Sequence, residues 1–338
     1  MSHFDSVLLV SFGGPGGLDD IRPFLANVLR GRRVPPERVE EVAKHYEHFD
    51  GVSPLTEYTM RQARGIEQRL RQKGLDLPVF VGMRNWHPYL ADTLSEMAEA
   101  GRRRAIGLIS AAHHSYSSCA QYKQNVINAR RELRQRGHDD IAVTYVDSWF
   151  EHPGFIRTIA EHIDEALNKL PEPLREKARL VFTAHSIPMS MANCCQYVEQ
   201  LTTSSKAAAA RLGRTDWTLV YQSRSGRPQD PWLEPDICDY LRQAKADGLA
   251  AAVIVPIGFV CDHIEVLHDL DDEAAETCQE VGLPMVRAET VNDDEHFIDA
   301  LADMVLRKHE QFKQFPPLPI VGSTGDLWPG QPAPPSKQ

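Results

Sequence analysis

The chain has 338 residues, of which 42% are hydrophobic and 25% are charged, a composition typical of a folded globular protein. Its 47 acidic residues outnumber its 37 basic ones, and the resulting net charge of −10 argues against nucleic acid as a partner. No apolar run approaches the roughly 20 residues of a transmembrane segment or follows the basic residues of a signal peptide, and six cysteines are too few for a disulfide framework, so we expect a cytoplasmic protein.

Short apolar runs rich in Val, Ile and Leu alternate along the chain with longer segments of helical period. In the first half these runs occupy residues 7–12, 79–83, 105–110 and 141–146. Amphipathic helices are expected at 57–73 and 123–136. Such alternation is typical of a parallel sheet covered by helices on both faces.

The second half repeats this pattern. Its apolar runs occupy residues 178–184, 217–223, 251–257 and 284–289. Helices are expected at 155–169 and 233–247. The two halves also resemble each other locally, because LISAAHH ends a run near His113 much as LVFTAHS ends one near His185. The repeat predicts two similar α/β domains, each with a four-stranded parallel sheet.

The repeat also predicts where the domains divide. We expect an N-terminal domain over residues 1–152 and a C-terminal domain over 153–294. A helix over 295–314 should then pack back across the domains. The segment 315–338 is rich in Pro and Gly and lacks any period, so we expect it to be a mobile tail.

Loops that follow strands are the first places to look for a site, because ligands of open parallel sheets lie beyond the carboxyl ends of the strands. The loop SFGGPGG at 11–17 lacks both the third glycine of a dinucleotide motif and the Lys-Ser/Thr of a P-loop, so we expect no nucleotide. Its glycines instead permit the backbone to approach a ligand closely and could form one side of a site for a flat molecule.

His185 is a candidate functional residue because it leaves a strand of buried type and enters a turn that Pro188 constrains. A lone histidine is ordinarily a structural residue whose ring bonds to a backbone carbonyl. The position of His185 at a strand end favours a functional role.

A row of carboxylates follows the seventh apolar run. Glu265, Asp269 and Glu273 are spaced four residues apart and predict one acidic side of a helix. Further acids nearby are Asp262, Asp272 and Glu276. A solvated helix face is the ordinary explanation, although like charges at this spacing destabilise a helix. The start of the row at a strand end, with His263 and His268 among the acids, favours a path for a hydrated divalent ion.

Six motifs in order give the chain a specific resemblance. They are LLVSFGGPGG, HFDGVSPLT (48–56), SYSSCAQY (115–122), TAHSIP, YQSRSGRPQDPWLEPDI (221–237) and GFVCDHIEVLHDLD (258–271). Over nearly its whole length the chain resembles the ferrochelatase family. SFGGPGG, RPFL and RNWHP are most similar to its actinobacterial, coproporphyrin-using branch.

The resemblance implies a fold and a reaction. The fold is two flavodoxin-like, chelatase-like domains with a porphyrin cleft between them. The reaction is insertion of Fe²⁺, as substrate, into a porphyrin in haem biosynthesis. Conversion of coproporphyrin III to coproheme is favoured over conversion of protoporphyrin IX to protoheme.

The resemblance also assigns residues. His185 and Glu265 match the metal-insertion pair, and Asp269 and Glu273 match an acidic metal path behind it. Positions that match porphyrin contacts are Phe12, Arg30, His45, Tyr46, Ser53 and Tyr122. Phe12 stands where some coproporphyrin enzymes have an axial tyrosine, so it can stack on the macrocycle but cannot ligate iron.

An iron–sulfur cluster is a further implication. Cys119 matches a ligand of a [2Fe-2S] cluster in some family members, whose other three ligands lie in a C-terminal tail. Here that tail contains no cysteine, and the adjacent Cys194 and Cys195 are the other candidate ligands. A cluster generally needs four thiolates, and the fourth is unassigned. The alternative is that these cysteines are small buried hydrophobes.

Two other functions stay open at this point. An anaerobic cobaltochelatase of corrinoid synthesis shares the fold, although the PWLEPDI block favours iron. A non-catalytic carrier of haem or another tetrapyrrole would hold its ligand without turnover. We expect a monomer rather than a dimer, with transient contacts to enzymes of the haem pathway.

Overall fold

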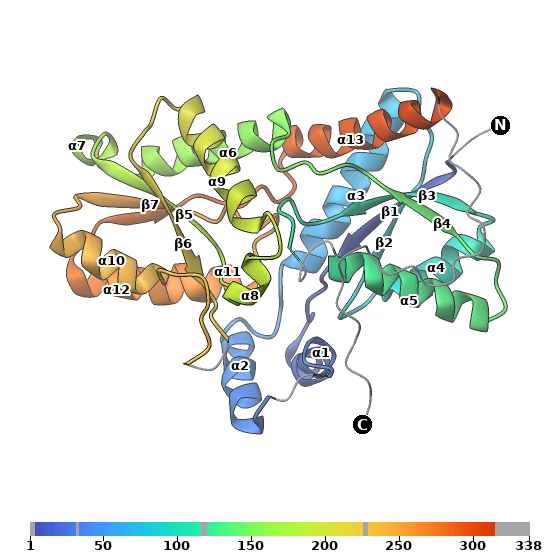
Figure 1. The fold of residues 1–338 in the computed structure, drawn as a ribbon, viewed down its shortest axis with the longest axis horizontal. Coiled ribbons are helices and arrows are strands. Elements are labelled where there is room, and N and C mark those ends of the chain that lie inside the picture. Colours follow the sequence, from blue (N-terminus) through green and yellow to red (C-terminus); the bar gives the residue numbers. More distant parts are fainter. Residues whose placement is uncertain (1–3, 32–33, 116–119, 226–228, 315–338) are drawn as a thin grey trace.

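The computed structural model describes residues 4–31, 34–115, 120–225 and 229–314 (Figure 1). It contains two four-stranded sheets, ordered β2-β1-β3-β4 and β6-β5-β7-β8, and every strand pair is parallel. The strands are β1 Ser6–Ser11, β2 Val79–Met83, β3 Arg104–Ile109, β4 Ala142–Tyr145, β5 Ala178–His185, β6 Trp217–Gln222, β7 Ala251–Val255 and β8 Met285–Arg287. All eight predicted strands are confirmed, and so is the α/β fold of two similar halves.

Helices cover both faces of each sheet (Figure 1). They are η1 Leu18–Asp20, α1 Ile21–Val28, α2 Pro36–His48, α3 Leu55–Gln72, α4 Leu90–Glu99, α5 Gln121–Gln135, α6 Pro153–Lys169, α7 Glu172–Arg175, α8 Met189–Ala192, α9 Tyr197–Arg211, α10 Ile237–Ala246, α11 Ile264–Val266, η3 Leu267–Glu273, α12 Ala274–Val281 and α13 Glu295–Gln314. This double cover explains the near-continuous apolar runs, since every residue of β1 and β7 is buried. No helix in the described ranges is long and apolar enough to cross a membrane.

The predicted start of one helix was wrong. We expected a helix from residue 233, but α10 begins at Ile237. Pro235 disfavours helical geometry in the residue before it. The Asp236 side chain then caps the helix by accepting a hydrogen bond from the Cys238 backbone N–H at 2.8 Å.

Helix α13 contacts both halves of the molecule through α3 and α6. Gly65 permits the close approach to α3, because a Cβ at this position would lie 2.9 Å from Cγ2 of Ile298. The largest hydrophobic cluster likewise includes residues of both sheets, such as Leu9 and Val253. The two halves therefore share packed surface, and the division after residue 152 stays a prediction.

The glycine-rich loop after β1 packs tightly against the segment that begins α3. A Cβ on Gly14 would lie 2.6 Å from Cβ of Ser53, which is 7% exposed. The Ser53 backbone N–H donates to the Pro15 carbonyl at 2.9 Å. Close backbone approach therefore explains Gly14, as expected from the sequence.

Gly14→Ala is expected to lower the free energy of unfolding by about 1–3 kcal/mol, because the added methyl group must displace Ser53. The control is Gly17→Ala, since a Cβ there meets no atom within 4 Å and the Gly17 backbone is extended. Urea unfolding of both variants measures the difference. Equal stability of the two variants would contradict the packing described here.

Candidate active site

The two central candidates lie at the carboxyl edge of the second sheet. His185 ends β5, and Glu265 follows the neighbouring strand β7. Gln222, which ends β6 and pairs in register with His185, donates from Nε2 to the Glu265 carbonyl oxygen at 3.4 Å. The backbone at Glu265 is therefore held beside the strand pair that presents His185, where a ligand of a parallel sheet is expected.

The His185 ring is oriented by its own turn. Its Nδ1 bonds to the carbonyl oxygen of Ser186, and because a carbonyl only accepts, Nδ1 carries the hydrogen. The Tyr197 hydroxyl donates to the His185 carbonyl at 3.2 Å and anchors the end of the strand. One ring nitrogen thus bonds as it would in a structural histidine, which leaves Nε2 as the ring nitrogen that can bind a proton or a metal.

Glu265 is an anion in contact with solvent. Its side chain is 41% exposed, and its Oε2 lies 3.7 Å from Nε2 of His263. Burial would raise the pKa of Glu265, but His263 and the charge of His185 outweigh it and lower the pKa to about 2. Glu265 is therefore ionised throughout the physiological range, close enough to His185 to interact with it electrostatically.

Asp269 accepts two hydrogen bonds, and yet its pKa is raised above the ordinary value. The Ser223 hydroxyl and the Gln222 amide, at 3.2 Å, both donate to its Oδ2. Burial raises the pKa of Asp269 most, the Ser223 bond lowers it, and the charges of Glu265 and Glu273 raise it again, to about 6. Asp269 can therefore gain or lose a proton near neutral pH.

The acidic row runs along a π-helix instead of the α-helix that the spacing predicts. Residues Leu267–Glu273 form η3, between the short α11 and the regular α12. Ligand atoms of His268, Asp269 and Glu273 all lie within 4.8 Å of one another. Wide π turns are uncommon and often occur at functional sites. The structure thus brings Asp269 and Glu273 together and adds His268 to them.

Asp269→Asn is expected to stabilise the metal-free protein above neutral pH. The folded-state pKa of about 6 exceeds the ordinary value of 3.8, so the folded state binds the proton more tightly, and the free energy of unfolding falls as pH rises through this window. The free energy of unfolding of the variant should exceed that of the wild type by about 1–2 kcal/mol near pH 8 and should be nearly equal to it near pH 4. Asp239→Asn, at an 81% exposed side chain, is the control. A stability difference that does not vary with pH would contradict this assignment.

Tyrosines of the first half approach these acids. Tyr46 of α2 is 7% exposed, and its pKa is raised by burial and by the charges of Glu265 and Asp269. Tyr122 of α5 is also buried. Burial raises its pKa to about 12, with a smaller contribution from Glu265 and an opposing one from Arg84. Neutral phenols from both helices therefore lie near the Glu265 carboxylate.

Arg84 is a site residue that the sequence analysis missed. Its guanidinium carbon lies 5.3 Å from the ring centroid of Phe12 and 5.3 Å from that of Tyr122. Both distances are within the range of cation–π attraction. Arg84 directly follows β2, so the strand-end rule that selects His185 could also have selected it.

The remaining predicted porphyrin contacts occupy different surroundings. The His45 ring packs on the His268 ring with centroids 3.7 Å apart. Ser53 lies buried beside the glycine loop. Arg30 is exposed beyond α1 and donates to the Asn27 side chain at 2.5 Å. Of the first-half candidates, His45, Tyr46 and Tyr122 are thus the ones that interact with residues of the acidic row.

The candidate cluster ligands are only partly described. Cys119 lies outside the described residues. Cys194 is exposed, and Cys195 is partly buried with its thiol donating to the Met191 carbonyl at 3.3 Å. Burial raises the pKa of the Cys261 thiol, as expected for a cysteine that packs as a small hydrophobe. The assignment of Cys119, Cys194 and Cys195 to a cluster stays a prediction.

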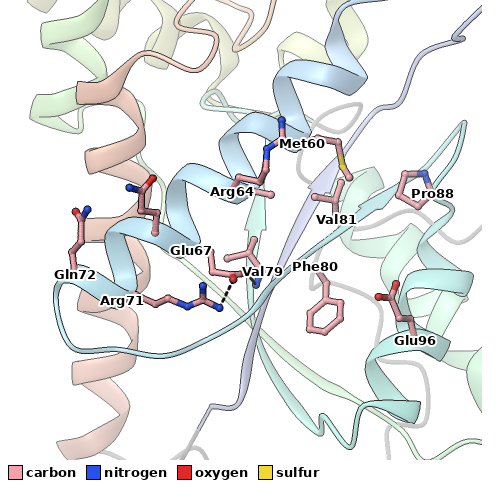
Figure 2. A pocket seen from close by; sticks show the side chains of 12 residues that line it. Met60, Arg64, Glu67, Arg71, Gln72, Val79, Phe80, Val81, Pro88 and Glu96 are labelled. Atoms are coloured by element: carbon pink, nitrogen blue, oxygen red, sulfur yellow. Dashed lines mark hydrogen bonds and ion pairs between the residues drawn. The ribbon is translucent and has the colours of Figure 1, made fainter.

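A groove of about 660 Å³ lies elsewhere, between α3 and the edge strand β2 (Figure 2). Figure 2 shows Arg64, Glu67 and Arg71 on one side of it and Phe80 on the other, with Glu67 joined to Arg71. None of the predicted site residues lines this groove. Its mixed charges and open shape give no constellation for catalysis.

A histidine and a carboxylate at neighbouring strand ends, backed by a file of acids, form a site suited to handling a metal ion. The ferrochelatase family model matches residues 5–309, and the chain belongs to the ferrochelatase family. A ferrochelatase of Rhodopirellula baltica is 45% identical over 328 residues, which cover 96% of this chain and 92% of the relative. The coproporphyrin III ferrochelatase of Streptomyces coelicolor is 44% identical over 322 residues, 91% and 86% of the two chains.

A solved structure agrees on the fold. SirB from Bacillus subtilis with Fe³⁺ aligns with 92% of this chain and 97% of its own, with a TM-score of 0.55 and 11% identity. The predicted family membership and the chelatase-like fold are confirmed. The protein is therefore a metal chelatase, and membership in this family favours it over the cobaltochelatase and the non-catalytic carrier.

Proposed function

We propose that the protein inserts Fe²⁺ into coproporphyrin III to give coproheme in haem biosynthesis. The observation that carries this proposal is the ionised Glu265 carboxylate near a His185 ring whose Nδ1 is held by the Ser186 carbonyl, which leaves Nε2 as the nitrogen available to the substrate. The name of the Streptomyces coelicolor relative supports coproporphyrin as the porphyrin. Protoporphyrin IX is the other porphyrin to be tested.

The chemistry of insertion assigns roles to the pair. Two pyrrole protons must leave, Fe²⁺ must lose its water, and the ring must bend so that its nitrogen lone pairs point at the metal. His185 Nε2 accepts one pyrrole proton from one face of the porphyrin, and the Glu265 carboxylate accepts the other from the opposite face. Asp269 and Glu273 deliver the hydrated cation, since carboxylate oxygens replace water readily around such ions.

The porphyrin occupies the space between the two halves. Tyr46 and Tyr122 supply buried aromatic surface next to Glu265, and Phe12 stacks on the macrocycle without ligating iron. Ser53 contacts the porphyrin edge beside the glycine loop, and Arg30 pairs with propionates at the rim. His45 borders the acidic row from the first half.

Anaerobic incubation of the purified protein with Fe²⁺ and either porphyrin tests the proposal. The Soret shift is expected to report turnover with both, with a higher kcat/KM for coproporphyrin III. A higher kcat/KM for protoporphyrin IX would overturn the choice of substrate. Insertion of Co²⁺ into sirohydrochlorin without insertion of Fe²⁺ into either porphyrin would overturn the ferrochelatase activity itself. Porphyrin binding without any metal insertion would overturn it too.

The remaining features are proposed with it. The protein acts as a cytoplasmic monomer that contacts other haem-pathway enzymes transiently, and its two domains meet after residue 152.

Cys119, Cys194 and Cys195 supply three thiolates to a [2Fe-2S] cluster, which would give the anaerobically purified protein a visible absorption spectrum. A colourless protein with no bound iron would overturn the cluster.

A further inference from the structure

Arg287 joins the two ends of the segment that carries Glu265. This arginine ends β8, which lies beside β7 at the edge of the second sheet. Its Nε and Nη2 donate to the two carboxylate oxygens of Asp271 at 2.6 and 2.8 Å. Its Nη1 donates to Oδ1 of Asp262 at 3.0 Å. One planar guanidinium therefore holds a residue shortly before Glu265 and another residue within η3.

The bonds of Arg287 are largely shielded from solvent. Its side chain is 13% exposed, that of Asp262 9% and that of Asp271 39%. Two parallel N–H···O bonds to one carboxylate fix the relative orientation of the partners as well as their distance. Fully exposed ion pairs, by contrast, hold their partners only weakly. Arg287 therefore gives the ends of the segment a defined geometry.

Asn292 fixes Asp262 from a second direction. Its Oδ1 accepts from the Asp262 backbone N–H, and its Nδ2 donates to Oδ2 of Asp262, both at 2.9 Å. Asn292 has a left-handed backbone with a φ of 42°, which asparagine adopts more readily than most residues. The Gln62 side chain of α3 donates to the Asn292 carbonyl at 2.6 Å. The anchor of Asp262 thus extends into the first half of the molecule.

The Glu265 carboxylate depends on these anchors more than Asp269 does. Asp269 is held directly from the end of β6 by Ser223 and Gln222. The carboxylate of Glu265 lies next to His263, which belongs to the same segment. Gln222 contacts Glu265 at its backbone carbonyl, at 3.4 Å. The position of the Glu265 carboxylate is therefore set by how the ends of its segment are held.

We propose that Arg287 is a positioning residue for iron insertion, whose bonds to Asp262 and Asp271 keep the Glu265 carboxylate within reach of the porphyrin. This inference rests on the proposed function, in which Glu265 accepts a pyrrole proton. Misplacement of a reacting group by about 1 Å can slow a reaction roughly hundredfold. Arg287 acts through its two carboxylate partners and not on the porphyrin itself.

Arg287→Lys in the full-length protein tests this role. Lysine keeps the positive charge but cannot bond both oxygens of a carboxylate in a fork. We expect kcat for insertion of Fe²⁺ into coproporphyrin III to fall about tenfold or more, while the KM for the porphyrin stays within about twofold. A wild-type kcat in a folded Arg287→Lys protein would overturn the inference.

The matched control is Arg130→Lys. Arg130 lies on α5 and donates to both oxygens of Asp140 at 2.9 and 2.8 Å, with a side chain that is 16% exposed. The pair therefore resembles that of Arg287 with Asp271 in geometry and burial. Arg130→Lys should lose the same fork and still insert iron at the wild-type rate.

A Glu265→Gln background separates positioning from a general structural role. Without the Glu265 carboxylate, Arg287→Lys should lower the single-turnover rate by less than about twofold further, because the group that it positions is gone. A tenfold loss that persists in this background would overturn the inference. Arginine would then support the fold and not the position of Glu265.

Asp271→Asn provides a second test if Arg287→Lys does not fold, because the Asp271 side chain is 39% exposed. It weakens one end of the connection and should lower kcat about threefold or more. An unchanged kcat in this variant would also overturn the inference. Loss of positioning would leave the wild-type protein active, whereas a wild-type protein that inserts no iron would overturn the proposed function and this inference with it.

Discussion

Glu265→Gln is expected to slow iron insertion by about 10²–10⁴-fold while the porphyrin still binds. Glutamine keeps the size of the side chain but can neither accept a pyrrole proton nor offset the charge of the arriving cation. The Glu265 carboxylate is ionised in the wild type because His263 and His185 lower its pKa to about 2. Single-turnover insertion under anaerobic conditions, followed through the Soret band, measures the effect.

The matched control removes a carboxylate outside the site. Glu310 lies exposed on α13, where it pairs with Lys313, so Glu310→Gln should insert iron at the wild-type rate. Porphyrin affinity, measured by fluorescence quenching, should be similar in all three proteins. Insertion by Glu265→Gln at more than half the wild-type rate would exclude this carboxylate from the reaction.

His185→Ala is expected to produce a loss of similar size, about 10²–10⁴-fold, because Nε2 is the base on the other face of the porphyrin. The double variant with Glu265→Gln should then insert iron within about tenfold of the slower single variant, since groups that act in one step are not additive. His138→Ala is the control for loss of an imidazole. Losses that multiply in the double variant would indicate two independent roles.

Much of the fold could be predicted because its determinants are local. A strand covered on both faces needs an unbroken apolar run, and β1 and β7 are such runs. The start of α10 was missed because the apolar pattern extends back to residue 233, whereas Pro235 and the Asp236 cap make the helix begin at Ile237. The π geometry of η3 was missed because carboxylates spaced four residues apart look the same in an α-helix.

Site residues could be predicted from the sequence only where they come directly after a strand. His185 and Glu265 each follow a recognisable strand, so the edge rule finds them. Gln222 and Ser223 hold Asp269, yet their role depends on the register between β6 and β5. The packing of His45 on His268 joins residues more than two hundred positions apart, and no local pattern could indicate it.

A crystal structure of the protein with coproporphyrin III bound tests the central assignment most directly. We expect the macrocycle between the two halves, with its four nitrogens between the imidazole of His185 and the carboxylate of Glu265. A porphyrin seated in the groove between α3 and β2, or with both side chains on one face of the ring, would contradict the assignment.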